Sequence, residues 1–172
     1  MHFKALFTFD KKKANNSQEA REYVSYFLSN EGFCSSGYFC SSVADWFVVG
    51  GRWSGELQGI KIYDKVMKAL DKDEKSFGLS TSDLADKENK KKILKIWKDE
   101  GGIGLCPYYR DSYDTYGYED DAMLVTKEIY DKFLKEYEGM ETDNEHFWDL
   151  DFEDVNEKFI GTKWVVVCDY HN

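Results

Sequence analysis

Residues 163–169 read Lys-Trp-Val-Val-Val-Cys-Asp, a run rich in β-branched residues without alternation of apolar and polar positions. Such a run is typical of a strand that is covered on both faces of a sheet. Residues 3–9, Phe-Lys-Ala-Leu-Phe-Thr-Phe, are apolar and alternate in part, so they predict a second strand near the other end of the chain. Residues 43–49 predict a third, buried strand that ends at two glycines.

Helical patterns lie between these strands. Asn16 is expected to cap a helix whose apolar residues recur at helical spacing from Ala20 to Leu28. Thr126 is expected to cap another, directly after a strand over 122–125. Ser82 or Asp83 is expected to cap a helix that continues to Trp97, and 64–70 predicts a shorter one.

Strands and helices are mixed without regular βαβ spacing, which favours an α+β fold. The 172 residues fit a single domain over 1–172, with a mixed or antiparallel sheet and helices packed mainly on one face. The apolar stretches are far shorter than the ~20 residues that cross a bilayer, and no secretion signal is visible. We therefore expect a cytoplasmic protein without a membrane span and with reduced thiols.

The charge balance restricts the partners. The chain has 33 acidic and 23 basic residues and a net charge of −10. Its long-range field repels phosphate backbones and attracts basic surfaces, so direct nucleic-acid binding is disfavoured and a protein partner with a basic surface is favoured. An acidic protein of this kind can also mimic nucleic acid in a basic groove.

The stretch 107–121 contains five tyrosines and five acidic residues and is predicted to be a surface loop. Tyrosines that bury one face and keep their hydroxyl groups in water are typical of binding surfaces. The predicted partner-binding residues are Tyr108, Tyr109, Tyr113, Tyr116 and Tyr118. Such a surface is also compatible with a homodimer.

The most unusual local sequence is 45–55, Asp-Trp-Phe-Val-Val-Gly-Gly-Arg-Trp-Ser-Gly. Paired glycines permit positive φ and a close approach of the backbone to a ligand. The Arg52 guanidinium suits a carboxylate or phosphate, and Trp46 or Trp53 could stack on it. The predicted ligand-binding residues are Asp45, Trp46, Gly50, Gly51, Arg52 and Trp53. The alternative is a structural hairpin in which Arg52 pairs with Asp45.

A second candidate cluster closes the sequence. Asp169 and His171 lie two positions apart, so on a continued strand they face the same side and could form an acid/base pair. The alternative is a frayed terminus. No recognisable motif for a metal or cofactor is present, and neither is predicted.

These residues resemble an uncharacterised family of small phage and bacterial proteins with a W-D-W-x-x-x-G-G-R-W motif and a V-x-D-x-H ending. The matching residues are Asp45-Trp46, Gly50-Gly51-Arg52-Trp53 and 167–171, whereas Ala44 replaces the first tryptophan. The resemblance implies that the two motifs belong to one unit and suggests a phage or mobile-element setting. It supplies no activity.

Two functional hypotheses follow, and the sequence does not decide whether the protein is an enzyme. The first is an accessory protein that binds a host protein, such as a nucleic-acid-processing or defence complex, and inhibits it. The second is a small enzyme or ligand-binding domain for a phosphorylated or nucleotide-like compound. In the second, Arg52 holds the anion, His171 acts as acid/base and Asp169 orients His171. Alternatively, both motifs are structural.

Overall fold

Strand β5, Lys163–His171, is the central strand of a five-stranded mixed sheet. The computed structural model describes residues 2–28, 46–72, 79–102, 106, 121–139 and 147–171. Strand β1, His2–Asp10, runs antiparallel to β5 along its whole length. The other edge of β5 pairs in succession with β3, Ala122–Leu124, and β2, Trp46–Val49. Strand β4, Phe147–Asp149, adds to β1 in parallel.

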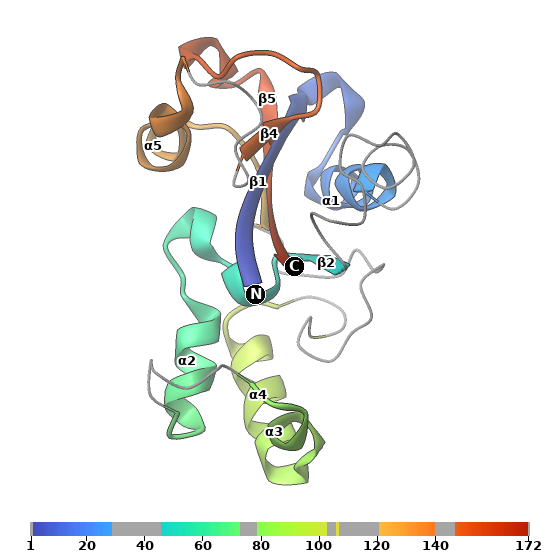
Figure 1. Ribbon diagram of the computed structural model, residues 1–172, viewed down its shortest axis with the longest axis vertical. Coiled ribbons are helices and arrows are strands. Elements are labelled where there is room, and N and C mark those ends of the chain that lie inside the picture. The colour runs from blue at the N-terminus through green and yellow to red at the C-terminus, as the bar shows by residue number, and fades with distance from the viewer. Residues whose placement is uncertain are drawn as a thin grey trace.

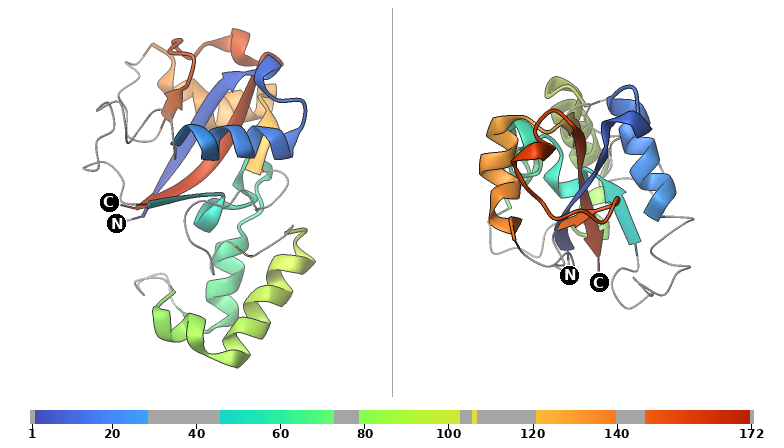
Figure 2. Two further views of the ribbon diagram at one scale, coloured as in Figure 1. Left: turned by 90° about the vertical axis from the view of Figure 1, so that its right-hand side faces the viewer. Right: turned by 90° about the horizontal axis from the view of Figure 1, so that it is seen from above.

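Both faces of β5 are buried, as its apolar run predicts. Val165, Val166 and Val167 have no exposed surface. Val166 and Cys168 pack into one hydrophobic cluster with helix α1, whereas Val165 and Val167 pack into another with the segment after β3. Figure 2 shows these two helical segments on opposite sides of the sheet. The α+β class and the mixed sheet are confirmed, but helices cover both faces rather than mainly one.

Helix α1, Ser17–Tyr26, begins where the sequence predicts. The Asn16 side chain accepts a hydrogen bond from the Glu19 amide, which caps the helix. Ala20, Val24 and Leu28 are buried against the sheet because they share one helical face.

The segment after β3 is also helical, as predicted, but not uniformly. Thr126 caps α5, Lys127–Ile129, which widens into π-helical η7, Tyr130–Leu134, and tightens into 3-10 helix η8, Lys135–Tyr137. Ile129, Tyr130, Phe133, Leu134 and Tyr137 are buried on its inner side.

A helical lobe with its own core lies beyond the sheet, at the lower end of the long axis in Figure 1. It consists of α2, Ile62–Ala69, α3, Thr81–Ala85, and α4, Lys87–Asp99. The helix predicted to start at Ser82 or Asp83 is in fact two. Ser80 caps α3 and Asp86 caps α4, so the chain turns at Asp86 instead of continuing.

Short 3-10 turns complete the fold: η1 at Lys11–Lys13, η3 at Gly51–Trp53, η4 at Glu56–Gln58 and η9 at Glu157–Phe159. Turns η3 and η4 connect β2 to α2, so they join the sheet to the helical lobe. Among the described residues, no helix is both long enough and apolar enough to cross a membrane.

Candidate functional site

The sheet brings together the two sequence motifs. Strand β2 pairs antiparallel with the end of β5, so that Val48 lies opposite Asp169 and Trp46 opposite His171. Figure 1 shows β2 beside the C-terminal end of β5. Residues more than 115 positions apart therefore lie side by side in the sheet. The side chains of Trp46 and His171 lie outside the described part of the structure, as does all of Asp45.

The glycine turn after β2 is fixed by Asp169. Gly50 and Gly51 have φ values of 76° and 57°, a region that residues with a Cβ adopt at a cost. The Asp169 carboxylate accepts a hydrogen bond from the Arg52 amide, with 3.2 Å between Arg52 N and Asp169 Oδ2. A Cβ on Gly51 would lie 2.5 Å from the Cβ of Asp169. The second glycine is thus required by both backbone conformation and space.

A second buried carboxylate, that of Asp121, holds the following residues. Asp121 has no exposed surface and accepts hydrogen bonds from the Ser54 hydroxyl at 2.9 Å and the Gly55 amide at 2.8 Å. A Cβ on Gly50 would lie 2.1 Å from Asp121 Oδ2. Sequence reasoning missed this role, because Asp121 is one of several acidic residues at the end of the tyrosine-rich stretch and no local pattern distinguishes it.

These carboxylates also affect Cys168, which has no exposed surface. Burial raises the pKa of the Cys168 thiol well above its usual value, and the nearby charges of Asp121 and Asp169 raise it further. Because the thiolate is the nucleophilic form, Cys168 is an inert structural thiol.

A pocket of about 330 Å³ lies directly after the glycine turn. Its lining contains two cationic and two acidic side chains together with aromatic and aliphatic ones, from Arg52, Trp53, Ser54, Glu56, Ile60, Lys61, Tyr63 and Asp64. The Arg52 guanidinium carbon lies 5.0 Å from the centre of the Tyr63 ring, which is a cation–π contact. The described aromatic partner of Arg52 is thus Tyr63 of α2, which the sequence analysis did not single out, and the predicted contact with Trp46 falls on a side chain outside the described residues.

Lys4 connects the pocket to the sheet. It lies opposite Asp169 in the β1–β5 register, and its Nζ is 2.9 Å from Glu56 Oε1. The same Nζ is 5.6 Å from the centre of a Trp53 ring and 5.5 Å from that of Phe133. Lys4 therefore neutralises one of the two acidic residues that line the pocket. Its strand pattern in the sequence gave no sign of this role.

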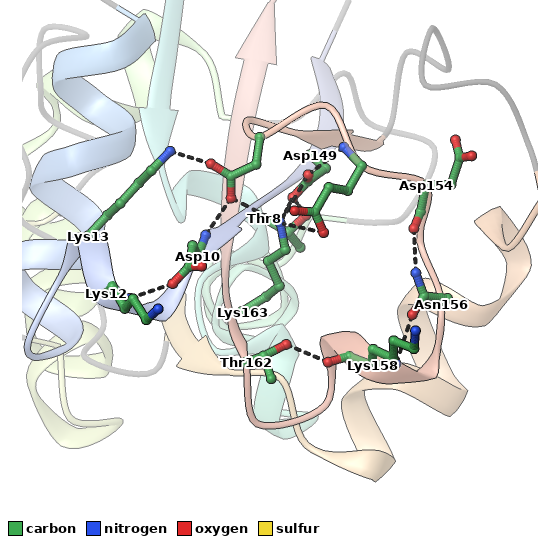
Figure 3. A network of polar contacts seen from close by, with 12 residues as sticks. Thr8, Asp10, Lys12, Lys13, Asp149, Asp154, Asn156, Lys158, Thr162 and Lys163 are labelled. Atoms are coloured by element: carbon green, nitrogen blue, oxygen red, sulfur yellow. Dashed lines mark hydrogen bonds and ion pairs between the residues drawn. The ribbon is translucent and has the colours of Figure 1, made fainter.

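Another polar cluster lies at the opposite end of the sheet and surrounds Lys163 (Figure 3). Lys163 is only 4% exposed, and its Nζ lies 3.1 Å from both Asp149 oxygens and 2.9 Å from Asp151 Oδ2. The Thr8 hydroxyl donates to Asp149 at 2.8 Å, and the Glu153 amide donates to the other oxygen at 2.9 Å.

Each buried or half-buried carboxylate of this cluster has a cationic partner, because Asp149 pairs with Lys163 and Asp151 pairs with both Lys163 and Lys13. Burial raises the pKa of Asp149, although its hydrogen bonds and Lys163 oppose the rise. Burial lowers the pKa of Lys163, but contacts with Asp151 and Asp149 outweigh burial and leave it above its ordinary value. Lys163 is therefore held as a cation, and we assign the cluster a structural role: it joins β1, β5 and the loop after β4.

The predicted partner-binding tyrosines, Tyr108 to Tyr118, lie outside the described residues. Within the described ranges, His, Cys, Asp and Glu side chains form no group of three that could hold a metal ion. The chain matches no protein-family model, no curated protein and no solved structure.

Proposed function

We propose that the chain binds a small anionic compound, phosphorylated or nucleotide-like, in the pocket after the glycine turn. The observation that carries the proposal is the position of Arg52. Its amide is held by Asp169 and its guanidinium is stacked on Tyr63, while its side chain lines the pocket. A guanidinium whose backbone is held by a hydrogen bond and which already packs against a ring loses less freedom when it binds a phosphate or carboxylate.

The charge of the pocket supports an anionic ligand. The charge of Glu56 is balanced by Lys4. The remaining charged side chains of the lining are two cations, Arg52 and Lys61, and one anion, Asp64, so the pocket has a net positive charge. The volume falls at the lower end of the range for small-molecule sites, about 300–1,000 Å³. The aromatic rings of Trp53 and Tyr63 provide apolar surface for a planar group such as a base.

Asp169 acts in this proposal as a positioning residue. It is 2% exposed and bonded to the Arg52 amide, so its carboxylate orients the anion-binding residue. The acid/base pairing of Asp169 with His171 stays a prediction, and binding does not depend on it.

Isothermal titration calorimetry with nucleoside monophosphates and inorganic pyrophosphate tests the proposal. Arg52→Ala should weaken binding at least tenfold, on the order of the 1.5–3 kcal/mol that a hydrogen bond to a charged group contributes. Arg52→Lys should restore only part of the affinity, because lysine keeps the charge and loses the planar fork.

The matched control is Lys65→Ala. Lys65 is an exposed cation on α2, the helix that carries Tyr63; it pairs with Glu100 and does not line the pocket. It should leave the affinity unchanged. Absence of binding to the wild-type protein, or equal losses from Arg52→Ala and Lys65→Ala, would show that the pocket is not the anion site.

A second candidate function is the binding of a host protein with a basic surface, as expected of a phage-type accessory or anti-defence factor. It is favoured by Phe152, which is 73% exposed and is followed by the exposed acidic residues Glu153 and Asp154. An aromatic anchor inside an acidic rim suits an apolar socket on a basic partner. Loss of affinity for an identified partner in Phe152→Ala, or in the combined Tyr109, Tyr113 and Tyr116 alanine variant, would support it.

A further inference from the structure

The net charge of −10 is unevenly distributed in the fold. Residues 61–100 contain 11 of the 23 basic residues and 9 of the 33 acidic ones, which leaves 12 basic and 24 acidic residues for the rest of the chain. Residues 61–100 include all three helices of the lobe, which extends away from the sheet along the long axis (Figure 1). The acidic surplus therefore belongs to the other part of the chain.

Helix α4 is the most basic element of the lobe. Its 13 residues include six lysines and two acidic residues, and all six lysines are exposed. Ile93 and Trp97 fill the opposite, buried side of the helix. Lys87, Lys91 and Lys95 follow i, i+4 spacing and Lys98 lies three positions further, so these four form one continuous face. We call Lys87, Lys91, Lys95 and Lys98 the α4 lysine face.

The acidic residues of α4 do not cancel this face. Glu88 pairs with Lys91 at 2.8 Å, and Asp99 pairs with Lys95. The side chains of the first pair are both 74% exposed and those of the second are 57% or more. Exposed pairs of this kind are weak and are screened by salt, so they yield readily to a more highly charged partner.

Screening also separates the α4 lysine face from the acidic remainder of the protein. At physiological ionic strength the field of an exposed charge decays over about 8 Å, so charges near one end of the face act weakly at its other end, about 16 Å away at a rise of 1.5 Å per residue. A partner that contacts α4 consequently experiences mainly the local positive charge. The net charge of −10 disfavours nucleic-acid binding only if it is spread evenly over the protein, and here it is not.

We propose that the α4 lysine face binds the phosphate backbone of a nucleic-acid duplex without sequence preference. Lysines in a row along a helix can contact several phosphates of a duplex, whose strands carry one phosphate about every 3.4 Å along the axis. The only aromatic residue of α4, Trp97, is buried, so the face has no ring on which unpaired bases could stack. This favours a duplex over a single strand, and the proposal is independent of the pocket.

Fluorescence anisotropy with a labelled DNA duplex of about 20 base pairs, at salt from about 50 to about 200 mM, tests the inference. The variant combines Lys87→Gln, Lys91→Gln and Lys95→Gln. We expect at least about tenfold weaker binding at low salt and a salt slope smaller by about 3, one for each lost phosphate contact. Circular dichroism should show unchanged helicity, because glutamine is a good helix former and all three sites are exposed.

The matched control combines Lys127→Gln, Lys135→Gln and Lys158→Gln, three exposed lysines outside the lobe. It changes the net charge by the same amount and should leave duplex affinity within about twofold, since distant charges are screened. Equal losses in both triple variants, or no duplex binding by the wild-type protein at low salt, would overturn the inference. Polyglutamate binding as tight as duplex binding would assign the face to acidic proteins instead.

Discussion

The carboxylate of Asp169 accepts a hydrogen bond from the backbone amide of Arg52, a residue 117 positions earlier in the chain. The bond connects the end of β5 to the turn that follows β2, and it sets where the Arg52 side chain leaves the backbone. Asp121 holds the next residues of the same turn through Ser54 and Gly55. Two buried carboxylates thus determine the shape of one pocket wall.

Gly51→Ala should destabilise the protein strongly. Alanine at this position would keep a positive φ, which is strained for a residue with a side chain, and its Cβ would lie 2.5 Å from the Asp169 Cβ. Backbone strain and overpacking act together and should lower the free energy of unfolding by at least about 3 kcal/mol. Gly161→Ala is the matched control, because Gly161 has φ 72° but nothing within 4 Å of the added Cβ. It should cost only about 1 kcal/mol. Urea denaturation compares them, and equal costs would contradict the close approach to Asp169.

Lys163→Met should reduce the free energy of unfolding by about 3–5 kcal/mol, because it leaves buried Asp149 without its cation. Lys127→Met removes a lysine that pairs with Asp131 at the surface, where the lysine side chain is 72% exposed. This control should change stability little, since exposed ion pairs are screened. Thermal unfolding monitored by circular dichroism distinguishes the variants. A small effect of Lys163→Met would mean that Asp149 is neutral in the folded protein.

Two tyrosines should ionise late. A hydrogen bond to Glu138, together with burial, raises the pKa of Tyr130 to about 12. Burial, together with Glu136, raises that of Tyr137 to about 12. The folded state holds these protons more tightly than the unfolded chain does, so this stabilisation is complete below pH 10.0 and is lost as the pH rises to about 12.

Glu138→Ala separates the two causes of these shifts. It should lower the pKa of Tyr130 by removing the bonded carboxylate, and leave that of Tyr137 in place. Carbon-13 NMR of labelled tyrosine side chains follows both residues through the titration. An unchanged pKa of Tyr130 would show that burial alone raises it.

Phe152→Asn should stabilise the protein by roughly 0.5–1 kcal/mol. Phe152 has φ 60°, which is unfavourable for a bulky residue and tolerated by asparagine, and its side chain is 73% exposed. Phe152→Ala removes the same ring but keeps a Cβ in the strained conformation, so it should not give this gain. If chemical denaturation shows that both variants gain equally, the effect comes from removing exposed apolar surface rather than from the backbone.

Much of the fold follows from local patterns. The apolar runs at residues 3–9 and 163–169 predict β1 and β5, and Asn16 and Thr126 cap helices where expected. The break at Asp86 was not predicted, because two successive caps, Ser80 and Asp86, lie within a pattern that is otherwise helical. Strand β4 has no counterpart among the predicted elements, since its three residues are too few to show a period.

The candidate site likewise has a part that local sequence predicts and a part that depends on the tertiary structure. The sequence by itself determined the buried strands, the paired glycines and the presence of Arg52 beside them, because backbone conformation and hydrophobic periodicity are local properties. Only the tertiary structure decided that Asp169 and Asp121 hold this turn and that Tyr63 contacts the Arg52 guanidinium. These are relations between residues distant in the chain, and they are set by how strands pair and helices pack.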